Sequence, residues 1–177
     1  MRKKILLLIP ALLVLLLIVI ALQPADYRVT RSTVVAAPAA VLFEQVNDFH
    51  KWEAWSPWAK LDPAMKTTYE GSAAGPGAVY TWTGNDKVGE GRMTILTNHP
   101  SDSIGIQLEF IRPFADRCAT EFTFTAQGTN TLVSWSMAGH KNFIAKAFCM
   151  VISMDRAIGG DFEKGLAQLG AVATARK

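Results

Sequence analysis

The chain has 177 residues, half of them hydrophobic, a length that suits one domain with a hydrophobic core of its own. It carries 18 Lys and Arg against 15 Asp and Glu, and three of the basic residues, Arg2, Lys3 and Lys4, stand together at the N-terminus. The rest is formally neutral and lacks the basic footprint of a nucleic-acid-binding protein, so we expect no nucleic acid partner.

The run from Ile5 to Leu22 contains no charged side chain and follows directly on the three basic residues. As a helix, it would be about 27 Å long, close to the thickness of a bilayer's hydrocarbon core. We therefore predict a membrane anchor over residues 1–23, with a cleaved signal peptide as the alternative.

The basic residues before this run indicate an N-terminus that stays in the cytoplasm. The prediction is a single-pass protein of a bacterial inner membrane, with its domain on the exported, periplasmic face. If the segment is cleaved, the domain is secreted or periplasmic instead.

The domain predicted after the anchor begins with a strand and a helix. Tyr27 to Val35 is rich in β-branched residues and predicts a strand. Ala36-Ala-Pro38 starts a helix that runs to Asn47-Asp48. Short alternating runs divided by turn residues then predict six antiparallel strands, at residues 66–71, 78–83, 91–97, 103–112, 119–127 and 131–139.

The chain ends in an apolar stripe with helical spacing. It runs from Asn142 to Leu169 and predicts one long amphipathic helix, with a kink or a loosened turn at Gly159-Gly160 and a tail over residues 171–177. We therefore predict an α+β helix-grip fold, in which a curved antiparallel sheet of about seven strands wraps around a long C-terminal helix. Such an arrangement leaves room for a pocket with apolar walls.

Four stretches, taken with the order of the elements, resemble the polyketide cyclase/dehydrase branch of the SRPBCC superfamily, whose members are START-like or Bet v 1-like. They are VVAAPAAVLF at 34–43, WEAWSPW at 52–58, GNDKVGEG at 84–91 and DFEKGLAQL at 161–169. The resemblance covers essentially the whole domain, residues 27–170, and implies a helix-grip fold with a deep cavity for a hydrophobic ligand. It transfers no catalytic residue set, because the fold serves carriers, receptors and enzymes.

Two functions follow as hypotheses. In the first, the protein holds a small hydrophobic or lipid-like molecule as a carrier, chaperone or sensor. In the second, it is a polyketide cyclase/dehydrase-like enzyme that uses an acidic group in the cavity. A purely structural docking domain is a third possibility, and the sequence identifies no protein partner.

Strand alternation and the helix stripe predict the residues that line the cavity. They are Tyr80, Trp82, Met93, Ile106, Leu108, Phe110, Phe122, Phe124, Trp135, Phe148, Val151 and Ile152. The tryptophans at 52, 55 and 58 either wall the cavity entrance or close the end of the core, and both interpretations remain open.

Asp155 and Glu90 are the candidate catalytic acids. Asp155 falls beside the apolar stripe and Glu90 in a glycine-rich hairpin, and the alternatives are an ion pair of Asp155 with Arg92 and a simple turn around Glu90. Neither metal-ligand spacing nor a nucleophile motif is present, so we predict no metal and no cofactor. Cys118 and Cys149 are either a disulfide or two buried thiols.

Overall fold

A computed structural model of the chain describes residues 2–175, with side chains described from residue 9 onward. The elements in chain order are α1 (Arg2–Leu22), β1 (Asp26–Val35), α2 (Ala39–Asn47), the 3-10 helix η1 (Phe49–Ala54), β2 (Lys66–Gly71), β3 (Ala78–Thr83), β4 (Glu90–His99), β5 (Ser103–Arg112), β6 (Asp116–Gln127), β7 (Asn130–His140), α3 (Phe143–Cys149) and α4 (Met154–Thr174).

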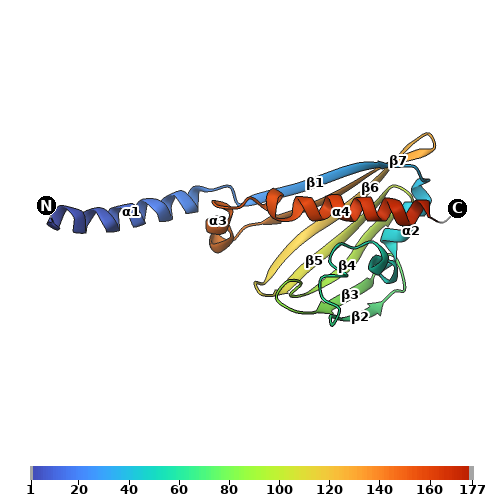
Figure 1. Cartoon of the computed structure of the whole chain (residues 1–177), viewed down its shortest axis with the longest axis horizontal. Coiled ribbons are helices and arrows are strands. Elements are labelled where there is room, and N and C mark those ends of the chain that lie inside the picture. The colour runs from blue at the N-terminus through green and yellow to red at the C-terminus, as the bar shows by residue number, and fades with distance from the viewer. Residues whose placement is uncertain (1, 176–177) are drawn as a thin grey trace.

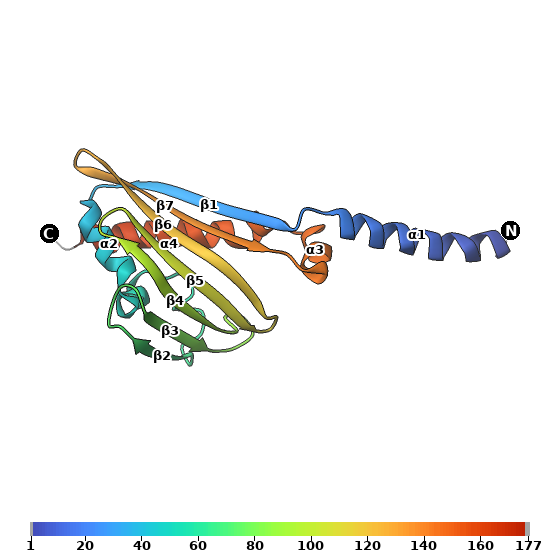
Figure 2. The same ribbon diagram turned by 180° about the vertical axis from the view of Figure 1, so that it is seen from behind.

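The seven strands form one antiparallel sheet in the order β1-β7-β6-β5-β4-β3-β2. The helix α4 lies across one face of this sheet and packs mainly along β1 (Figure 1). Seen from behind, the strands stand in front of α4 (Figure 2). This architecture confirms the predicted α+β class, the seven strands and the helix-grip arrangement.

The core fills the space between the inner face of the sheet and the helices. Every second residue of a strand points to the same face, so Val29, Ile104, Phe122 and Val133 all face inward and are buried. From above the sheet, α4 adds Phe162, Leu166 and Leu169, and α2 adds Leu42 and Val46. Pro38 stands at the N-cap of α2, as the sequence predicted for the helix start.

The predicted anchor extends over residues 1–23, of which residue 1 and the side chains of residues 1–8 lie outside the described part. The helix α1 projects away from the domain (Figure 1). Among the residues that the structure describes, no helix is both long enough and apolar enough to cross a membrane.

The predicted C-terminal helix is in fact two helices, which corrects the sequence interpretation. The chain leaves the helix after Cys149 and re-enters it at Met154, where the Ser153 hydroxyl accepts a hydrogen bond from the Arg156 N–H at 3.3 Å. The side chain of Asn142 caps α3 in the same way, at 2.9 Å from the Ala145 N–H. Each short polar side chain satisfies a free N–H of a first turn, so each starts its own helix.

The glycines at which the sequence predicts a kink or a loosened turn, Gly159 and Gly160, both lie inside the continuous helix α4. They differ in their surroundings: a Cβ on Gly159 would overlap the guanidinium of Arg31, whereas a Cβ on Gly160 would meet nothing within 4 Å. Gly159 is thus the residue that lets the Arg31 side chain lie against the helix.

This difference gives a matched pair of variants. Gly160→Ala should raise the free energy of unfolding by about 0.5–1 kcal/mol, since alanine favours the helix over glycine. Gly159→Ala should raise the free energy of unfolding by less than Gly160→Ala does, or should lower it. The reason is that Arg31 must move away from its partners on α4 to make room for the new methyl group. Urea unfolding of both variants tests the pair, and an equal gain in both would contradict the packing of Arg31 against Gly159.

Candidate functional site

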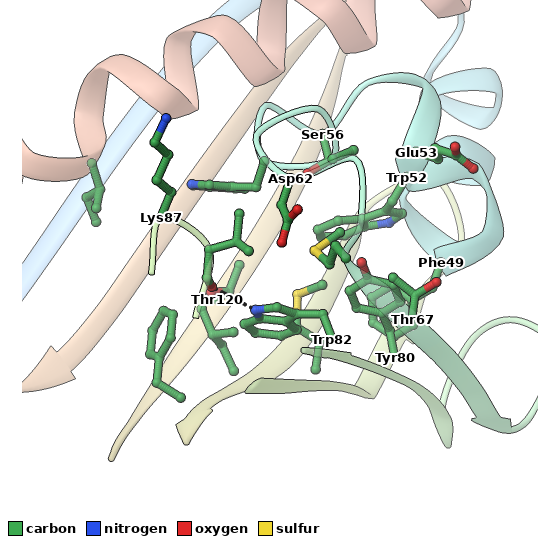
Figure 3. Close-up of a pocket in the computed structure, with 18 of the residues that line it drawn as sticks. Phe49, Trp52, Glu53, Ser56, Asp62, Thr67, Tyr80, Trp82, Lys87 and Thr120 are labelled. Carbon is green, nitrogen blue, oxygen red and sulfur yellow. Dashed lines mark hydrogen bonds between the residues drawn. The ribbon is translucent and has the colours of Figure 1, made fainter. Parts of the chain in front are cut away.

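A pocket lies between the inner face of the sheet and the roof formed by η1, the segment that follows it and α4 (Figure 3). Its volume is about 430 Å³, within the range of about 300–1,000 Å³ typical of small-molecule sites. The sheet contributes Tyr69, Tyr80, Trp82, Phe110 and Trp135, and the roof contributes Phe49, Trp52, Trp58, Ile158 and Phe162.

Strand register explains how residues far apart in sequence meet in the pocket floor. Tyr80 pairs with Met93, and Met93 pairs with Leu108, so these three side chains form one row across β3, β4 and β5. In the neighbouring row, Trp82 pairs with Gly91. A Cβ on Gly91 would overlap the Trp82 ring, so the glycine makes room for the indole to lie flat in the floor.

Half of the predicted lining is part of the pocket wall, namely Tyr80, Trp82, Met93, Leu108, Phe110 and Trp135. Three further predicted residues, Ile106, Phe122 and Phe124, face the same side but are buried in the core.

The other predicted positions, Phe148, Val151 and Ile152, lie outside the pocket and correct the prediction. They are exposed on α3 and on the segment between α3 and α4, with exposed fractions of 57%, 81% and 41%. The break before Ser153 is the reason: it carries the first part of the predicted helix off the sheet, so its apolar stripe faces outward.

The three clustered tryptophans have different positions. Trp55 is fully buried and donates to the Gln45 carbonyl at 3.2 Å, so it belongs to the core. Trp52 is buried too, but its ring borders the pocket while its indole N–H donates to the Val46 carbonyl at 2.9 Å. Trp58 is half-buried, borders the pocket and meets the Trp135 ring edge-on at 5.7 Å. Both sequence interpretations therefore apply, each to different tryptophans.

Sequence reasoning missed the polar residues at the pocket, of which Asp62 is the most buried carboxylate. It accepts hydrogen bonds from the backbone N–H groups of Ala64 at 3.0 Å and Asn85 at 2.7 Å. The bond from Asn85 ties the roof to the hairpin between β3 and β4, which also contributes Lys87 and Val88 to the pocket lining. The sequence marks Asp62 only as part of a turn-forming Asp-Pro pair. It gives no sign of the hydrogen bond to Asn85, because that residue is distant in sequence.

The phenol of Tyr80 is a neutral group in the pocket wall. Burial, with smaller contributions from Tyr69 and Glu53, raises the pKa of Tyr80 to about 12. Because the charged form is disfavoured when water is removed, this phenol keeps its proton at every physiological pH.

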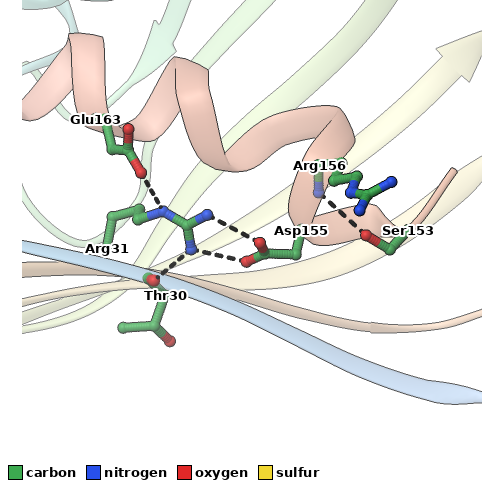
Figure 4. A network of polar contacts seen from close by, with 6 residues as sticks. All are labelled: Thr30, Arg31, Ser153, Asp155, Arg156 and Glu163. Carbon is green, nitrogen blue, oxygen red and sulfur yellow. Dashed lines mark hydrogen bonds and ion pairs between the residues drawn. The ribbon is translucent and has the colours of Figure 1, made fainter.

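The two candidate catalytic acids are both held in ion pairs and are not part of the pocket lining. The Arg31 guanidinium donates to both oxygens of Asp155, at 2.7 and 3.0 Å, and to Glu163 at 2.6 Å (Figure 4). The prediction that Asp155 pairs with Arg92 is therefore wrong. Its partner Arg31 belongs to the edge strand β1, against which α4 packs. Glu90 pairs with Arg112 at 2.9 Å.

Asp155 provides a test of this assignment. The hydrogen bonds from Arg31 hold the pKa of Asp155 below its usual range, so its stabilising effect is present above the unfolded pKa of about 3.9 and is lost as the pH falls through the folded pKa. Asp155→Asn should lower the melting temperature slightly at neutral pH and not at all in strong acid. It should leave ligand affinity within about twofold of wild type, because Asp155 does not line the pocket.

Melting curves from pH 2 to 7, together with binding assays, check this expectation. Loss of ligand binding in a folded Asp155→Asn variant would show that this carboxylate takes part in the function.

The described residues contain no group of three or more His, Cys, Asp or Glu side chains placed to hold a metal ion. His50 pairs with Asp48 and His140 with Asp26, each at 2.9 Å. Both cysteines are free, and burial raises the pKa of the Cys118 thiol to about 11.

A family model described as polyketide cyclase / dehydrase and lipid transport matches residues 26–174. No curated protein matches the chain.

Several solved structures are similar to it over most of their length. Protein MLL2253 from Mesorhizobium loti is 16% identical, with a TM-score of 0.61 over 85% of this chain and 99% of that one. Ms6760 from Mycobacterium smegmatis is 18% identical, with a TM-score of 0.59 over 85% and 92%. The Zhui aromatase/cyclase from Streptomyces sp. R1128 is 14% identical, with a TM-score of 0.60 over 85% and 95%. At these identities, the likeness shows the fold alone.

Proposed function

The chain belongs to the polyketide cyclase/dehydrase and lipid transport family, and from this and the geometry of its pocket we propose that it binds a small hydrophobic molecule between the sheet and α4. In this proposal the protein acts as a carrier, chaperone or sensor. The observation that supports it best is the pocket itself, of about 430 Å³ and walled largely by aromatic and aliphatic side chains.

The contacts around the pocket favour binding over acid/base chemistry. Asp62 uses its oxygens to accept backbone hydrogen bonds, and Asp155 and Glu90 are engaged by arginines. A general acid or base needs a proton-transfer group within hydrogen-bond reach of the substrate. The enzyme alternative would therefore depend on Glu53 or Asp62, the carboxylates that border the pocket.

A comparison of bound molecules tests the binding function. The full chain and its Leu108→Trp variant, whose new side chain occupies the pocket, are expressed and purified side by side and then extracted with organic solvent. Mass spectrometry should find a hydrophobic compound enriched in the wild type, while lipids held by α1 appear equally in both. Identical extracts, together with no binding of added aromatic probes, would contradict the proposal.

We also propose that α1 attaches the domain to the bacterial inner membrane, with the N-terminus in the cytoplasm and the domain on the exported face. The apolar side chains of α1 from Ile9 onward are largely exposed, which favours a lipid surrounding over water. A second apolar surface lies next to it: α3 has no buried residue, and Lys146 donates to the Ala21 carbonyl at the end of α1 at 3.0 Å. This arrangement would place Phe143, Ile144 and Phe148 near the lipid surface.

Alkaline phosphatase fused after residue 177 tests this orientation, since the enzyme is active only when exported. We expect an active fusion that remains in membranes after a carbonate wash. An inactive fusion would contradict the export, and an active fusion released by the wash would contradict the attachment.

A further inference from the structure

Two buried polar atoms in the pocket wall have no hydrogen-bond partner among the described residues. They are the Thr120 hydroxyl oxygen and the Trp135 indole nitrogen. The two residues are only 5% and 2% exposed, and both border the pocket. Buried polar groups are normally paired, so two unpaired groups at one wall call for an explanation.

Strand pairing brings these two groups together. Thr120 pairs with Met137 across β6 and β7, and Trp135 pairs with Phe122, two residues along from Thr120 on the same face. Diagonal neighbours of this kind lie roughly 7–8 Å apart, within reach of one small group or of two groups on one ring. Figure 3 shows Thr120 among the pocket residues.

Several comparable side chains elsewhere in the domain have hydrogen-bond partners. The indole N–H groups of Trp52, Trp55 and Trp82 each donate to a backbone carbonyl, at 2.9, 3.2 and 2.9 Å. The hydroxyl of Thr131, which is fully buried, donates to the Ala37 carbonyl at 2.8 Å. The fold thus supplies partners to these other buried indoles and hydroxyls. Two further buried side-chain groups in the described residues also lack a partner, the Tyr27 hydroxyl and the Gln45 amide nitrogen. Of these four unpaired groups, only those of Thr120 and Trp135 belong to residues that border the pocket.

The orientation of the Trp135 indole is fixed by its neighbours. The ring stacks on Phe162 with centroids 4.2 Å apart and an angle of 4° between the planes, and on Phe122 at 4.7 Å. An indole N–H donates and does not accept, while a threonine hydroxyl does both. A ligand group that satisfies the pair must therefore include a hydrogen-bond acceptor.

We propose that the pocket selects hydrophobic molecules that carry a neutral oxygen acceptor, such as a ketone or quinone oxygen on an aromatic ring system, and that Trp135 and Thr120 bind that oxygen. This inference depends on the proposed binding function and specifies its ligand class. The aromatic side chains around the pair would contact the ring system of the ligand.

A pair of probes with the same shape tests the selection. In 2-acetylnaphthalene a carbonyl stands where 2-isopropenylnaphthalene has a methylene group. Binding of both is measured with the full chain, and the Leu108→Trp protein serves as the blank for uptake by α1 and detergent. We expect the affinity of the wild type for the ketone to be about fivefold or more above its affinity for the hydrocarbon, which is the effect of one buried hydrogen bond. Hydrophobicity alone would favour the hydrocarbon, so this preference would come from the hydrogen bond.

Two variants should change the preference. Thr120→Val and Trp135→Phe each remove one of the proposed donors, and each should reduce the preference for the ketone at least about threefold. Thr131→Val is the control, because it removes a buried hydroxyl that already has a partner outside the pocket. It should keep the full preference.

The melting temperature of the ligand-free protein supplies a second readout. Thr120→Val should leave it unchanged or raised, because an unpaired hydroxyl is replaced by a methyl group. Thr131→Val should lower it, because a hydrogen bond is lost. A drop for Thr120→Val as large as that for Thr131→Val would show that the Thr120 hydroxyl is already satisfied within the protein and would overturn the inference.

The outcomes separate this inference from the binding function. If the wild type binds both probes equally and Thr120→Val changes nothing, the acceptor selection is wrong while the hydrophobic pocket stands. If the wild type binds neither probe above the Leu108→Trp blank, the binding function itself fails, and the selection with it.

Discussion

Trp55→Ala should lower the free energy of unfolding by about 3–5 kcal/mol, the usual cost of removing a large aromatic side chain from a core. Trp55 is fully buried, and its ring contacts Trp52 at a centroid distance of 4.6 Å, Trp135 at 5.9 Å and Phe122 at 6.0 Å. The variant also leaves the Gln45 carbonyl without its indole donor. A loss of this size is a large part of the stability of an ordinary domain.

Urea unfolding followed by the remaining tryptophan fluorescence measures this loss. The matched control is Trp58→Ala, which removes the same side chain from a half-buried position at the pocket and should cost clearly less. If Trp58→Ala cost as much as Trp55→Ala, the division of the tryptophan cluster into a core member and a pocket member would be wrong.

Leu108→Trp should weaken binding of the preferred probe at least tenfold, about 1.4 kcal/mol or more, while the protein stays folded. Leu108 is partly buried in the middle of the pocket floor, between Met93 on β4 and Cys118 on β6. A larger side chain there enters existing free space, so it competes with the ligand and does not overpack the core.

Gln107→Trp is the control for this variant, because it adds the same side chain one residue earlier on β5, where it points to the other face of the sheet. Binding should survive in this control. Full affinity in the Leu108→Trp protein, measured by fluorescence titration with 2-acetylnaphthalene, would mean that the ligand occupies another place.

The sheet was the part of the fold that the sequence predicted best. Phe122 and Phe124 alternate with Thr123 and Thr125, and this period of two assigns both the strand and its inner face. The same alternation put Tyr80 and Trp82 on one face of their strand, and the register then joins that face with Leu108 in one pocket floor. The local pattern was enough to predict these strands and their inner face, because one face of the sheet is buried and the other is not.

The C-terminal half of the fold was harder to predict, because its apolar spacing continues across a break. Phe143 and Phe148 continue the stripe that Phe162 and Leu166 form later, and periodicity alone joins them into one helix. The division depends on the Ser153 cap. A serine two residues before an acidic residue indicates such a start, but tertiary packing decides whether the chain uses it.

The polar part of the site could not be predicted for a different reason. That Thr120 faces inward follows from alternation, whereas its lack of a partner depends on every group around it. The pairing of Arg31 with Asp155 and Glu163 likewise joins the first strand to the last helix. Such contacts form only when the sheet wraps around α4. The sequence pattern predicts this arrangement but not which side-chain atoms meet in it.

The position of β1 has a mechanical consequence. This strand follows α1 after three residues, forms the edge of the sheet and pairs antiparallel with β7 over its whole length, from Asp26 with His140 to Val35 with Thr131. The far end of α4 lies at the opposite end of the domain from α1 (Figure 1). A pulling force between these two ends would run along β1 and load its hydrogen bonds in shear, so that they resist together and do not open one after another.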